Sequence, residues 1–477
     1  MRRPATHFLL RHAVLATLLV PLAAGAWQAS LETLQLLLAW EIGAPGGLRA
    51  RDGTSNNGGD GDGAPEPLTL RLADDLWRVP AIATLTGTIT DTAPHGLHSN
   101  VFRPFVALAL IRSDNLLGLV DAAAALRKTG SISRGDTERR RTAGIAFDKD
   151  ISRQHVSGIL RLSRNTFDRL SMLDHTEKEA ALNWNWRAGD VVSGAVGLYR
   201  AKKLAPFDDF HLAERNLVAL RRETADVDWQ LPAHWHLSGG VVRNMLRYDL
   251  VSQQGADRNV LETSGGLANI SSAGNSIGLR ALHTEGTFLT QTVAAGAGGT
   301  TDAKSYRQNE VRSELDWHVS TKTRLRANAG WIDRQSGSDA AGAVGFTGFA
   351  GRGTASWEAT AKTAVSATLW RELVPADDRR ASTYAVTRGG ALGATWRLSD
   401  KTALELRTAM EHYLSIPLSQ GLAALREVRS DGAISLQYMP TPFLTITPVL
   451  AYRRVTSDTP LTGYRRTSVS LTAQYQH

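Results

Sequence analysis

The chain has 477 residues, of which 42% are hydrophobic and 21% charged, as expected of a folded protein rather than a disordered one. Its mean hydropathy of -0.20 and the lack of a long apolar run after the N-terminus argue against a helical membrane protein. They leave a membrane β-barrel open, because alternating strands hide an apolar outer face from any averaged scale. Cysteine is absent, which excludes disulfides, thiolate metal sites and a catalytic cysteine.

Residues 1–26 have the layout of a secretory signal peptide. Arg2, Arg3 and Arg11 precede an apolar run that starts at Ala13, and an Ala-Gly-Ala cleavage site ends at Ala26. The apolar run is too short for a full membrane span, so we expect export. Removing the three arginines lowers the formal charge from +8 to +5 (8 minus 3). That moderate basicity suits an anionic partner or an ordinary solvated surface, and no nucleic-acid partner is expected.

Residues 27–100 form the predicted N-terminal extension. Within it, residues 43–66 are rich in Gly, Asp and Asn, a composition typical of a flexible linker. We expect residues 101–477 to form a single β-barrel, because the pattern becomes regular from residue 101 onward. In residues 314–320, for example, Leu315, Trp317 and Val319 alternate with charged or polar residues, which is the period of a strand with one apolar and one polar face.

Short polar turns and longer polar loops alternate along this region. The turns predict sixteen strands, and one further strand at each end makes eighteen. Short turns at one end and long loops at the other are typical of outer-membrane barrels. We therefore predict an all-β fold, a transmembrane antiparallel outer-membrane β-barrel of about 18 strands. The eight short turns lie near residues 151–154, 189–190, 232–234, 272–275, 320–323, 361–363, 399–402 and 441–442.

Aromatic residues precede several of the short turns, and three of them repeat at intervals of 40 and 39 residues. A Trp or Tyr ring at the headgroup level satisfies both an apolar body and a polar tip. We therefore expect an aromatic girdle on the periplasmic side of the membrane; the alternative is core packing in a soluble sandwich. Trp370 is out of phase with its neighbours and is left unassigned. The girdle comprises Trp186, Trp229, Trp317, Trp357, Trp396 and Tyr438.

Arginines on the polar faces of the strands are the predicted contacts for a passing polymer. Interleaved carboxylates accompany them, so a hydrated lumen lined by both signs of charge could contact sugar hydroxyls and carboxylates. The alternative is a lumen closed by internal salt bridges. The candidate residues are Arg280, Arg312, Arg324, Arg326, Arg397 and Arg407.

No catalytic residues, metal site or cofactor are expected. Two His-x-Ser pairs, at residues 155–157 and 318–320, match the spacing found in outer-membrane phospholipases, but they lie beside short turns, at the opposite end from the pair of that family. His234 and His236 lack a third ligand of suitable spacing. The acidic segment 207–211 could hold a cation, but a solvated acidic loop is the favoured interpretation.

The segment Arg103-Pro104-Phe105-Val106, followed by 113–119 (SDNLLGL), resembles the start of the barrel in the EpsL family of exopolysaccharide-biosynthesis outer-membrane proteins. The resemblance covers roughly residues 101–477. It implies an outer-membrane step in polysaccharide secretion, with no catalytic residues. The implied partners are outer-membrane lipid, a periplasmic polysaccharide-export protein, the polysaccharide chain and the barrel-assembly machinery. Barrel sequences usually end in an aromatic residue, whereas this one ends in His477.

The sequence therefore predicts a non-enzymatic exit channel for an exopolysaccharide in the outer membrane of a Gram-negative bacterium. A general porin or sugar-uptake channel is the alternative, and an outer-membrane enzyme is a third interpretation.

Overall fold

The computed structural model describes residues 101–476, except 209, 290–292, 296–298, 302–304, 337–344, 376–381, 418–423 and 460–461. The predicted signal peptide and N-terminal extension lie outside the described residues.

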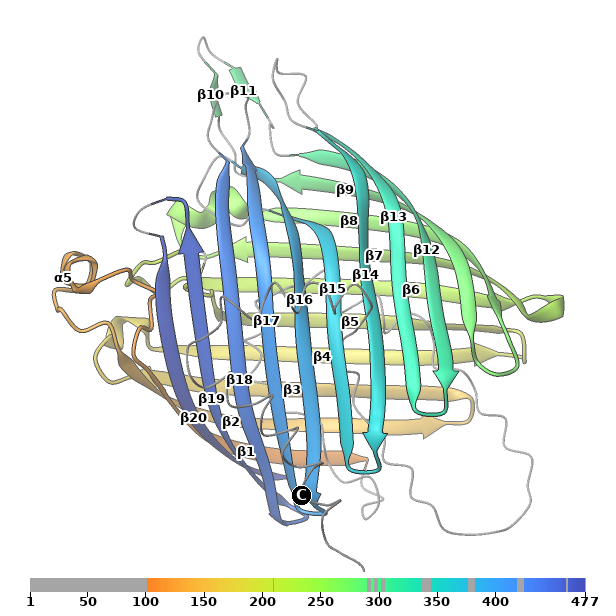
Figure 1. Ribbon diagram of the computed structural model, residues 1–477, viewed down its shortest axis with the longest axis horizontal. Coiled ribbons are helices and arrows are strands. Elements are labelled where there is room, and N and C mark those ends of the chain that lie inside the picture. The colour runs from red at the N-terminus through yellow and green to blue at the C-terminus, as the bar shows by residue number, and fades with distance from the viewer. Residues whose placement is uncertain are drawn as a thin grey trace, which may run out of the picture. The chain divides into compact units, whose positions relative to one another are not determined.

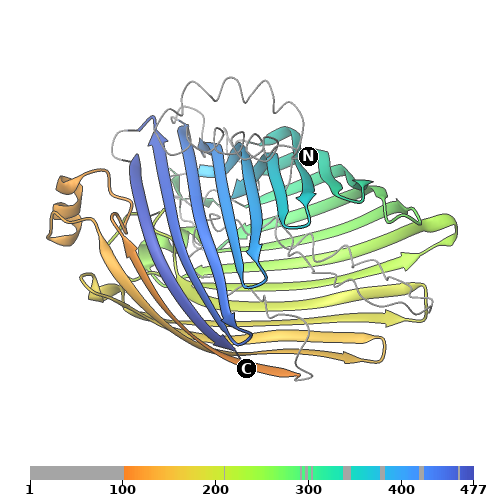
Figure 2. The ribbon, with the colours of Figure 1, turned by 60° about the horizontal axis from the view of Figure 1, so that its bottom comes forward.

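Eighteen strands form one closed antiparallel sheet (Figure 1, Figure 2). Each strand pairs with the next along the chain, β9 pairs with β12, and β20 pairs with β1 to close the ring. The predicted antiparallel barrel of about 18 strands is confirmed. The wall strands are β1 (Phe102–Ser113), β2 (Asp136–Ile151), β3 (Gln154–Phe167), β4 (His175–Ala188), β5 (Val192–Leu204), β6 (Leu217–Gln230), β7 (Trp235–Tyr248), β8 (Arg258–Ile270), β9 (Ser276–Phe288), β12 (Tyr306–Ser320), β13 (Thr323–Ser336), β14 (Phe346–Thr360), β15 (Thr363–Pro375), β16 (Ser382–Ser399), β17 (Thr402–Pro417), β18 (Leu425–Thr441), β19 (Leu444–Ser457) and β20 (Tyr464–Gln476).

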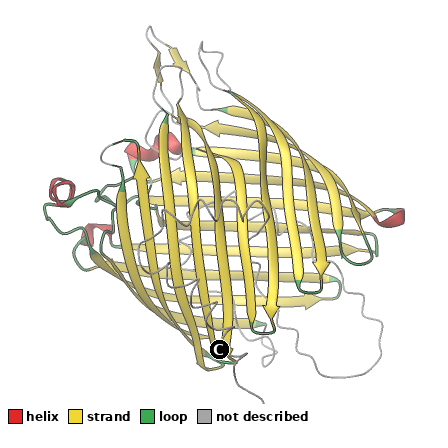
Figure 3. Ribbon diagram, viewed as in Figure 1, coloured by secondary structure: helices red, strands yellow, loops and turns green. Residues whose placement is uncertain are grey.

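The eight predicted short turns join consecutive strands at one end of the sheet (Figure 3). Three of them share the sequence Ser/Thr-x-Lys-Thr, at residues 320–323, 360–363 and 399–402. In each, the backbone N–H of the lysine donates to the hydroxyl of the first residue, at 3.2, 3.1 and 3.3 Å. This bond supplies a local turn in place of a ladder bond, and a shift in strand register accompanies it.

The alternating pattern places large apolar side chains on the outer face, whereas the inner face carries polar, small and buried apolar ones. On β1, Leu108 and Leu110 face outward and are 63% and 49% exposed, whereas Phe105 and Ala107 face inward and are buried. An apolar outer band with no open strand edge satisfies the requirements of a bilayer, because each wall strand pairs with a neighbour on both sides.

The long connections lie at the other end. The β1–β2 connection contains helix α5 (Ala122–Thr129), capped by Asp121, whose carboxylate accepts from the backbone of Ala124 at 2.7 Å. The 3-10 turns η1 (Ser171–Leu173) and η3 (Val251–Ala256) lie in two other connections at this end, and β10 (Val293–Ala295) pairs with β11 (Gly299–Thr301) beyond β9. A third 3-10 turn, η2 (Pro232–His234), forms the short turn between β6 and β7 at the opposite end. In the described part of the chain, no helix has the length and apolar character needed to cross a membrane.

Candidate functional site: the lumenal wall and the mouth of the barrel

The six predicted arginines all occupy inward-facing positions of the wall. Arg280 on β9 lies directly opposite Arg312 on β12, a pairing of like charges that destabilises a sheet when nothing compensates it. The carboxylate of Glu314 compensates it by accepting from the Nε atoms of both arginines at 3.1 Å. Arg280 also donates to the hydroxyls of Ser264 and Ser238, at 3.4 and 3.3 Å.

A second shared carboxylate lies on β12, one inward position nearer the short turns. Asp316 is bound by both side-chain nitrogens of Arg324, at 2.7 and 2.8 Å, and lies 3.7 Å from Nε of Arg326. On β17, Arg407 donates to Glu405 at 2.6 Å. Arg397 is exposed, near a short turn. Five of the six arginines therefore lie in ion pairs, and the wall presents balanced rather than net positive charge.

The substitution Asp316→Ala tests this balance. It removes the carboxylate that two guanidinium groups share, and we expect a loss of about 1.5–3 kcal/mol in the free energy of unfolding, the range for hydrogen bonds to charged groups. Urea titration of the barrel in detergent measures this loss, with Glu358→Gln, at an exposed position beside a short turn, as the control. Equal midpoints for the two variants would contradict the shared ion pair.

A cavity of about 100 Å³ opens in the inner wall of β5–β9. Hydroxyls and charged groups line it, among them Ser238, Ser264, Arg222, Asp226 and Arg280. Backbone without side chains forms part of its surface at Gly240, where an added Cβ would meet its nearest neighbour at 3.4 Å. Hydroxyls, a carboxylate and guanidinium groups around one small recess can make several hydrogen bonds to a sugar-sized polar solute.

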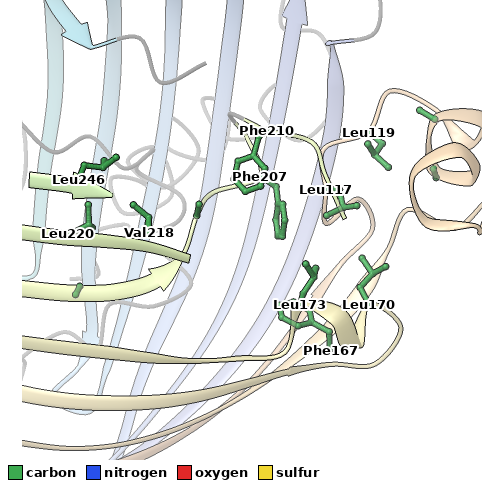
Figure 4. Packing of buried hydrophobic residues seen from close by; sticks show 14 residues of the cluster. Leu117, Leu119, Phe167, Leu170, Leu173, Phe207, Phe210, Val218, Leu220 and Leu246 are labelled. Carbon is green, nitrogen blue, oxygen red and sulfur yellow. The ribbon is translucent and has the colours of Figure 1, made fainter. Parts of the chain in front are cut away.

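A hydrophobic cluster that three connections build together lies at the end of the barrel with the long connections (Figure 4). We call it the mouth cluster. The β5–β6 connection contributes Phe207 and Phe210, whose ring centroids are 5.8 Å apart. The β1–β2 and β3–β4 connections contribute Leu117 and Leu173, which are 1% and 0% exposed. The remaining buried members are Leu119, Ala124, Ala125, Phe167, Leu170, Ala201, Ala205, Val218, Leu220 and Leu246.

Asp208 anchors this cluster to strands β19 and β20. Its carboxylate accepts from the hydroxyl of Tyr464 at 2.6 Å and from Arg466 at 2.7 Å, and it pairs with Arg453. Arg453 and Arg466 are themselves cross-strand neighbours on β19 and β20, so one carboxylate again bridges two opposed arginines. Burial alone would raise the pKa of Asp208, but Arg466, Arg453 and Tyr464 hold it well below its ordinary value. The predicted solvated acidic loop is therefore wrong for Asp208, which is buried.

The β5–β6 connection consequently reaches past four strands of the wall through Asp208. Strands β1 to β4 lie between its own strands and the β19–β20 pair that Asp208 contacts. The neighbouring His211 donates from Nδ1 to the backbone carbonyl oxygen of Leu117, 2.9 Å away, and its ring meets that of Tyr464 edge-on. Gly118, at φ +62°, lies beside both rings, where an added Cβ would be 3.1 Å from each. Glycine permits this backbone conformation and this close contact together.

His211 gives the mouth a pH dependence. Its burial lowers the pKa of the imidazole, so the ring is neutral at pH 7 and folding disfavours its protonated form. The contribution of His211 to docking is present above the ordinary pKa of histidine and is lost as pH falls towards the lowered value. We expect trypsin cleavage at the exposed Arg215 to accelerate between pH 7 and pH 5. A His211→Gln variant should show a flatter profile, and identical profiles would contradict this role.

The predicted girdle residues lie on the outer face, near the short turns. Trp229, Trp317, Trp357, Trp396 and Tyr438 are 50%, 51%, 52%, 47% and 43% exposed, and Trp186 is half-buried. Two neighbours that the predicted set omits, Trp184 and Trp235, are also outward and exposed. Their place in a membrane interface stays a prediction.

Trp370, which the sequence left unassigned, faces the lumen. Its Nε1 donates to Glu411 at 3.0 Å, and the guanidinium of Arg352 lies 5.3 Å from its ring centroid. Gly389 on β16 makes room for the ring, since a Cβ there would come within 2.6 Å of it. The alternation of the strand predicts this inward position, because Trp370 lies between the outward residues Leu369 and Arg371. An indole beside a guanidinium offers a lumenal surface on which a sugar ring could stack.

The histidines do not assemble a catalytic or metal centre within the described residues. His155 bonds to Asp150 at 2.8 Å and His236 bonds to Asp228 at 2.7 Å, both beside short turns. His234 lies in η2 and His236 at an inward position of β7. The described part of the chain contains no group of three His, Asp or Glu residues that could hold a metal ion.

Comparisons with known proteins give structural likenesses only. No protein-family model and no curated protein sequence matches the chain. Among solved structures, the chain is similar to the outer-membrane protein OpdK of Pseudomonas aeruginosa, with 9% identity, coverage of 79% of this chain and 99% of that one, and a TM-score of 0.43. The chain is also similar to OccAB3 of Acinetobacter baumannii, with 10% identity, coverage of 79% of this chain and 99% of that one, and a TM-score of 0.44. For a bacterial polysaccharide outer-membrane secretin, the identity is 6%, the coverage is 78% of this chain and 98% of that one, and the TM-score is 0.32.

Proposed function

We propose that this protein is an outer-membrane channel through which a secreted exopolysaccharide leaves the cell. The observation that carries the proposal is the closed 18-stranded sheet, with an apolar outer face and an inner face lined by hydroxyls and ion pairs. Such a barrel can lie in a bilayer and enclose a hydrated passage. The resemblance of residues 101–477 to the EpsL family supplies the identity of the cargo. The channel carries out no chemistry of its own.

Transport through this channel is passive. The lumenal arginines are already neutralised by carboxylates such as Glu314 and Asp316, so an acidic polymer exchanges one weak contact for another. Weak, repeated contacts suit transport, because a tight site would hold the chain in place. The cavity beside Arg280 and the lumenal face of Trp370 are two such contact points along the wall.

Partners follow from the same proposal. A periplasmic polysaccharide-export protein would meet the end with the short turns. The barrel-assembly machinery would recognise the last strand, β20, through its outward residues Val469, Leu471, Ala473 and Tyr475, of which Val469, Leu471 and Tyr475 are 55%, 51% and 48% exposed. Outer-membrane lipid would surround the girdle residues.

Deletion of the gene tests the proposal. We expect surface polysaccharide to disappear while its intracellular precursors persist, and the wild-type gene to restore secretion. The protein should fractionate with outer membranes and migrate differently on a denaturing gel before and after boiling. Normal secretion in the deletion strain would overturn the export function, and recovery as a periplasmic protein without heat-modifiable migration would overturn the membrane location.

A general porin or sugar-uptake channel is the second candidate function. The mouth cluster favours it, because the β5–β6 connection reaches Arg453 and Arg466 on the inner wall and so takes up space at the mouth that a polymer would need. The cavity of about 100 Å³ also suits a single sugar unit. Two measurements together distinguish the candidates: the swelling of liposomes that contain the purified protein in mono- and disaccharides, and polysaccharide secretion by the deletion strain. Rapid swelling combined with unaffected secretion would favour uptake.

A further inference from the structure

Basic side chains gather on the outer face of β2–β6, towards the end with the long connections. They alternate along the strands with outward leucines, such as Leu160 and Leu162 on β3, which are both 55% exposed. Positive charge on a surface that otherwise suits lipid is costly unless it lies near the interface or has a partner. We call this group the cationic belt; its members are Arg141, Arg164, Lys178, Arg200, Lys202 and Arg221.

Members of the cationic belt face one another across neighbouring strands. Arg141 is directly opposite Arg164, Lys178 is opposite Lys202, and Arg200 is opposite Arg221. Directly opposed like charges destabilise a sheet. The same arrangement recurs on the outer face elsewhere in the ring, where Arg371 opposes Arg388 and Arg454 opposes Arg465.

Protein carboxylates compensate only part of this charge. Lys202 pairs with Asp249 at 2.8 Å, and Arg221 pairs with Glu223. Among the described residues, no carboxylate lies within ion-pair distance of Arg141, Lys178 or Arg200, and all three are exposed. At least one cation of each of the three opposed pairs therefore lacks a carboxylate partner.

The inner face shows what a compensated pair looks like in this protein. There, Arg280 opposes Arg312 and the two share Glu314, while Arg453 opposes Arg466 and the two share Asp208. Inside, one oxyanion thus bridges each opposed pair. Outside, the corresponding position of the anion lies beyond the protein surface, where a ligand with anionic oxygens can occupy it.

We propose that the cationic belt binds the phosphate groups of lipopolysaccharide, the phosphorylated glycolipid of the outer leaflet; this rests on the outer-membrane location proposed above. Phosphate oxygens accept two parallel hydrogen bonds from a guanidinium group, and clustered Lys and Arg bind anionic lipid surfaces. Leu160 and Leu162, on the same face of β3 as Arg164, provide an apolar surface for acyl chains. The girdle residues at the opposite end of the strands place the belt on the outer side of the membrane.

Titration of the purified full-length protein in detergent tests the proposal. The probes are lipopolysaccharide, phosphatidylcholine and inorganic phosphate, and the readout is the midpoint temperature of unfolding. We expect lipopolysaccharide to raise the midpoint of the wild type. The triple variant Arg141→Gln/Lys178→Gln/Arg200→Gln should bind it about a hundredfold more weakly. The matched control, Lys322→Gln/Lys362→Gln/Lys401→Gln, removes the same charge at the short turns and should bind like the wild type.

Three outcomes overturn the proposal: equal affinity of the triple variant and the wild type, equal weakening in the control, or stabilisation by inorganic phosphate that matches that of lipopolysaccharide. The last would assign the belt to free phosphate. Normal polysaccharide secretion in the deletion strain would contradict the export function but not the binding of lipopolysaccharide. Failure to bind lipopolysaccharide, in a protein that is found in outer membranes, would contradict this inference alone.

Discussion

Replacing Asp208 with Asn is expected to open the mouth of the barrel. The substitution keeps the shape of the side chain but removes the charge that bridges Arg453 and Arg466. Arg453 retains Asp431, at 2.6 Å, whereas Arg466 loses its carboxylate. Removing one partner of a buried ion pair costs about 3–5 kcal/mol. We therefore expect residues 205–216 to leave the mouth and single-channel conductance in planar bilayers to rise.

The matched control is Glu214→Gln, which removes a carboxylate from an exposed position of the same connection. It should leave conductance unchanged. Trypsin cleavage at Arg215 gives a second readout that does not depend on the pore, and it should accelerate only in Asp208→Asn. Heat-modifiable migration should persist in both variants, since the wall ladder is untouched. Unchanged conductance and unchanged cleavage in Asp208→Asn would show that the carboxylate does not hold the connection in place.

The ionisation of Asp208 also predicts how the wild type responds to acid. Because its pKa is lowered in the folded protein, its contribution is complete above the ordinary pKa of an aspartate and is lost only as pH falls through the lowered value. The anchor should therefore persist at pH 4, below the range in which His211 weakens docking. Docking of the β5–β6 connection should therefore weaken in two steps as pH falls, first when His211 is protonated and then, in stronger acid, when Asp208 is protonated.

The wall of the barrel was predictable because its pattern is local. A period of two along residues 314–320 decides which side chain faces the lumen, whatever the partner strand is. Turn residues such as the Ser/Thr-x-Lys-Thr tetrads then fix where each strand ends. Strand number, pairing of neighbours and the inward positions of the six arginines all follow from these two local signals.

The mouth was not predictable in the same way. Asp208 and Arg453 are separated by 245 residues, and nothing in the acidic segment 207–211 distinguishes an anchor from a solvated loop. The opposed cations outside the barrel were equally hidden, because the register between strands decides which residue lies opposite which: Arg200 faces Arg221 only in the observed pairing of β5 with β6. Ion pairing of the lumenal arginines likewise needed the register between β9 and β12.

The lipid-facing assignment leads to a paired test on adjacent residues of β13. Ala329 faces outward between Ser313 and Gly351, whereas Asn328 faces the lumen between Glu314 and Arg352. A lysine near the bilayer midplane on the lipid face costs about 2–4 kcal/mol, so Ala329→Lys should lower the free energy of unfolding by that amount. Asn328→Lys adds the same side chain beside a carboxylate in a hydrated lumen and should change stability by about 0.5 kcal/mol or less.

Urea titration of both variants in phospholipid vesicles, followed by tryptophan fluorescence, measures the difference. Repeating the titration in a short-chain detergent should reduce the penalty for Ala329→Lys, because a micelle deforms around a buried charge more readily than a bilayer does. Similar losses in the two variants would indicate that both faces of β13 have the same polarity, and the barrel would then not lie in a membrane with its apolar face outward. A large loss confined to Ala329→Lys is the outcome that alternation along β13 requires.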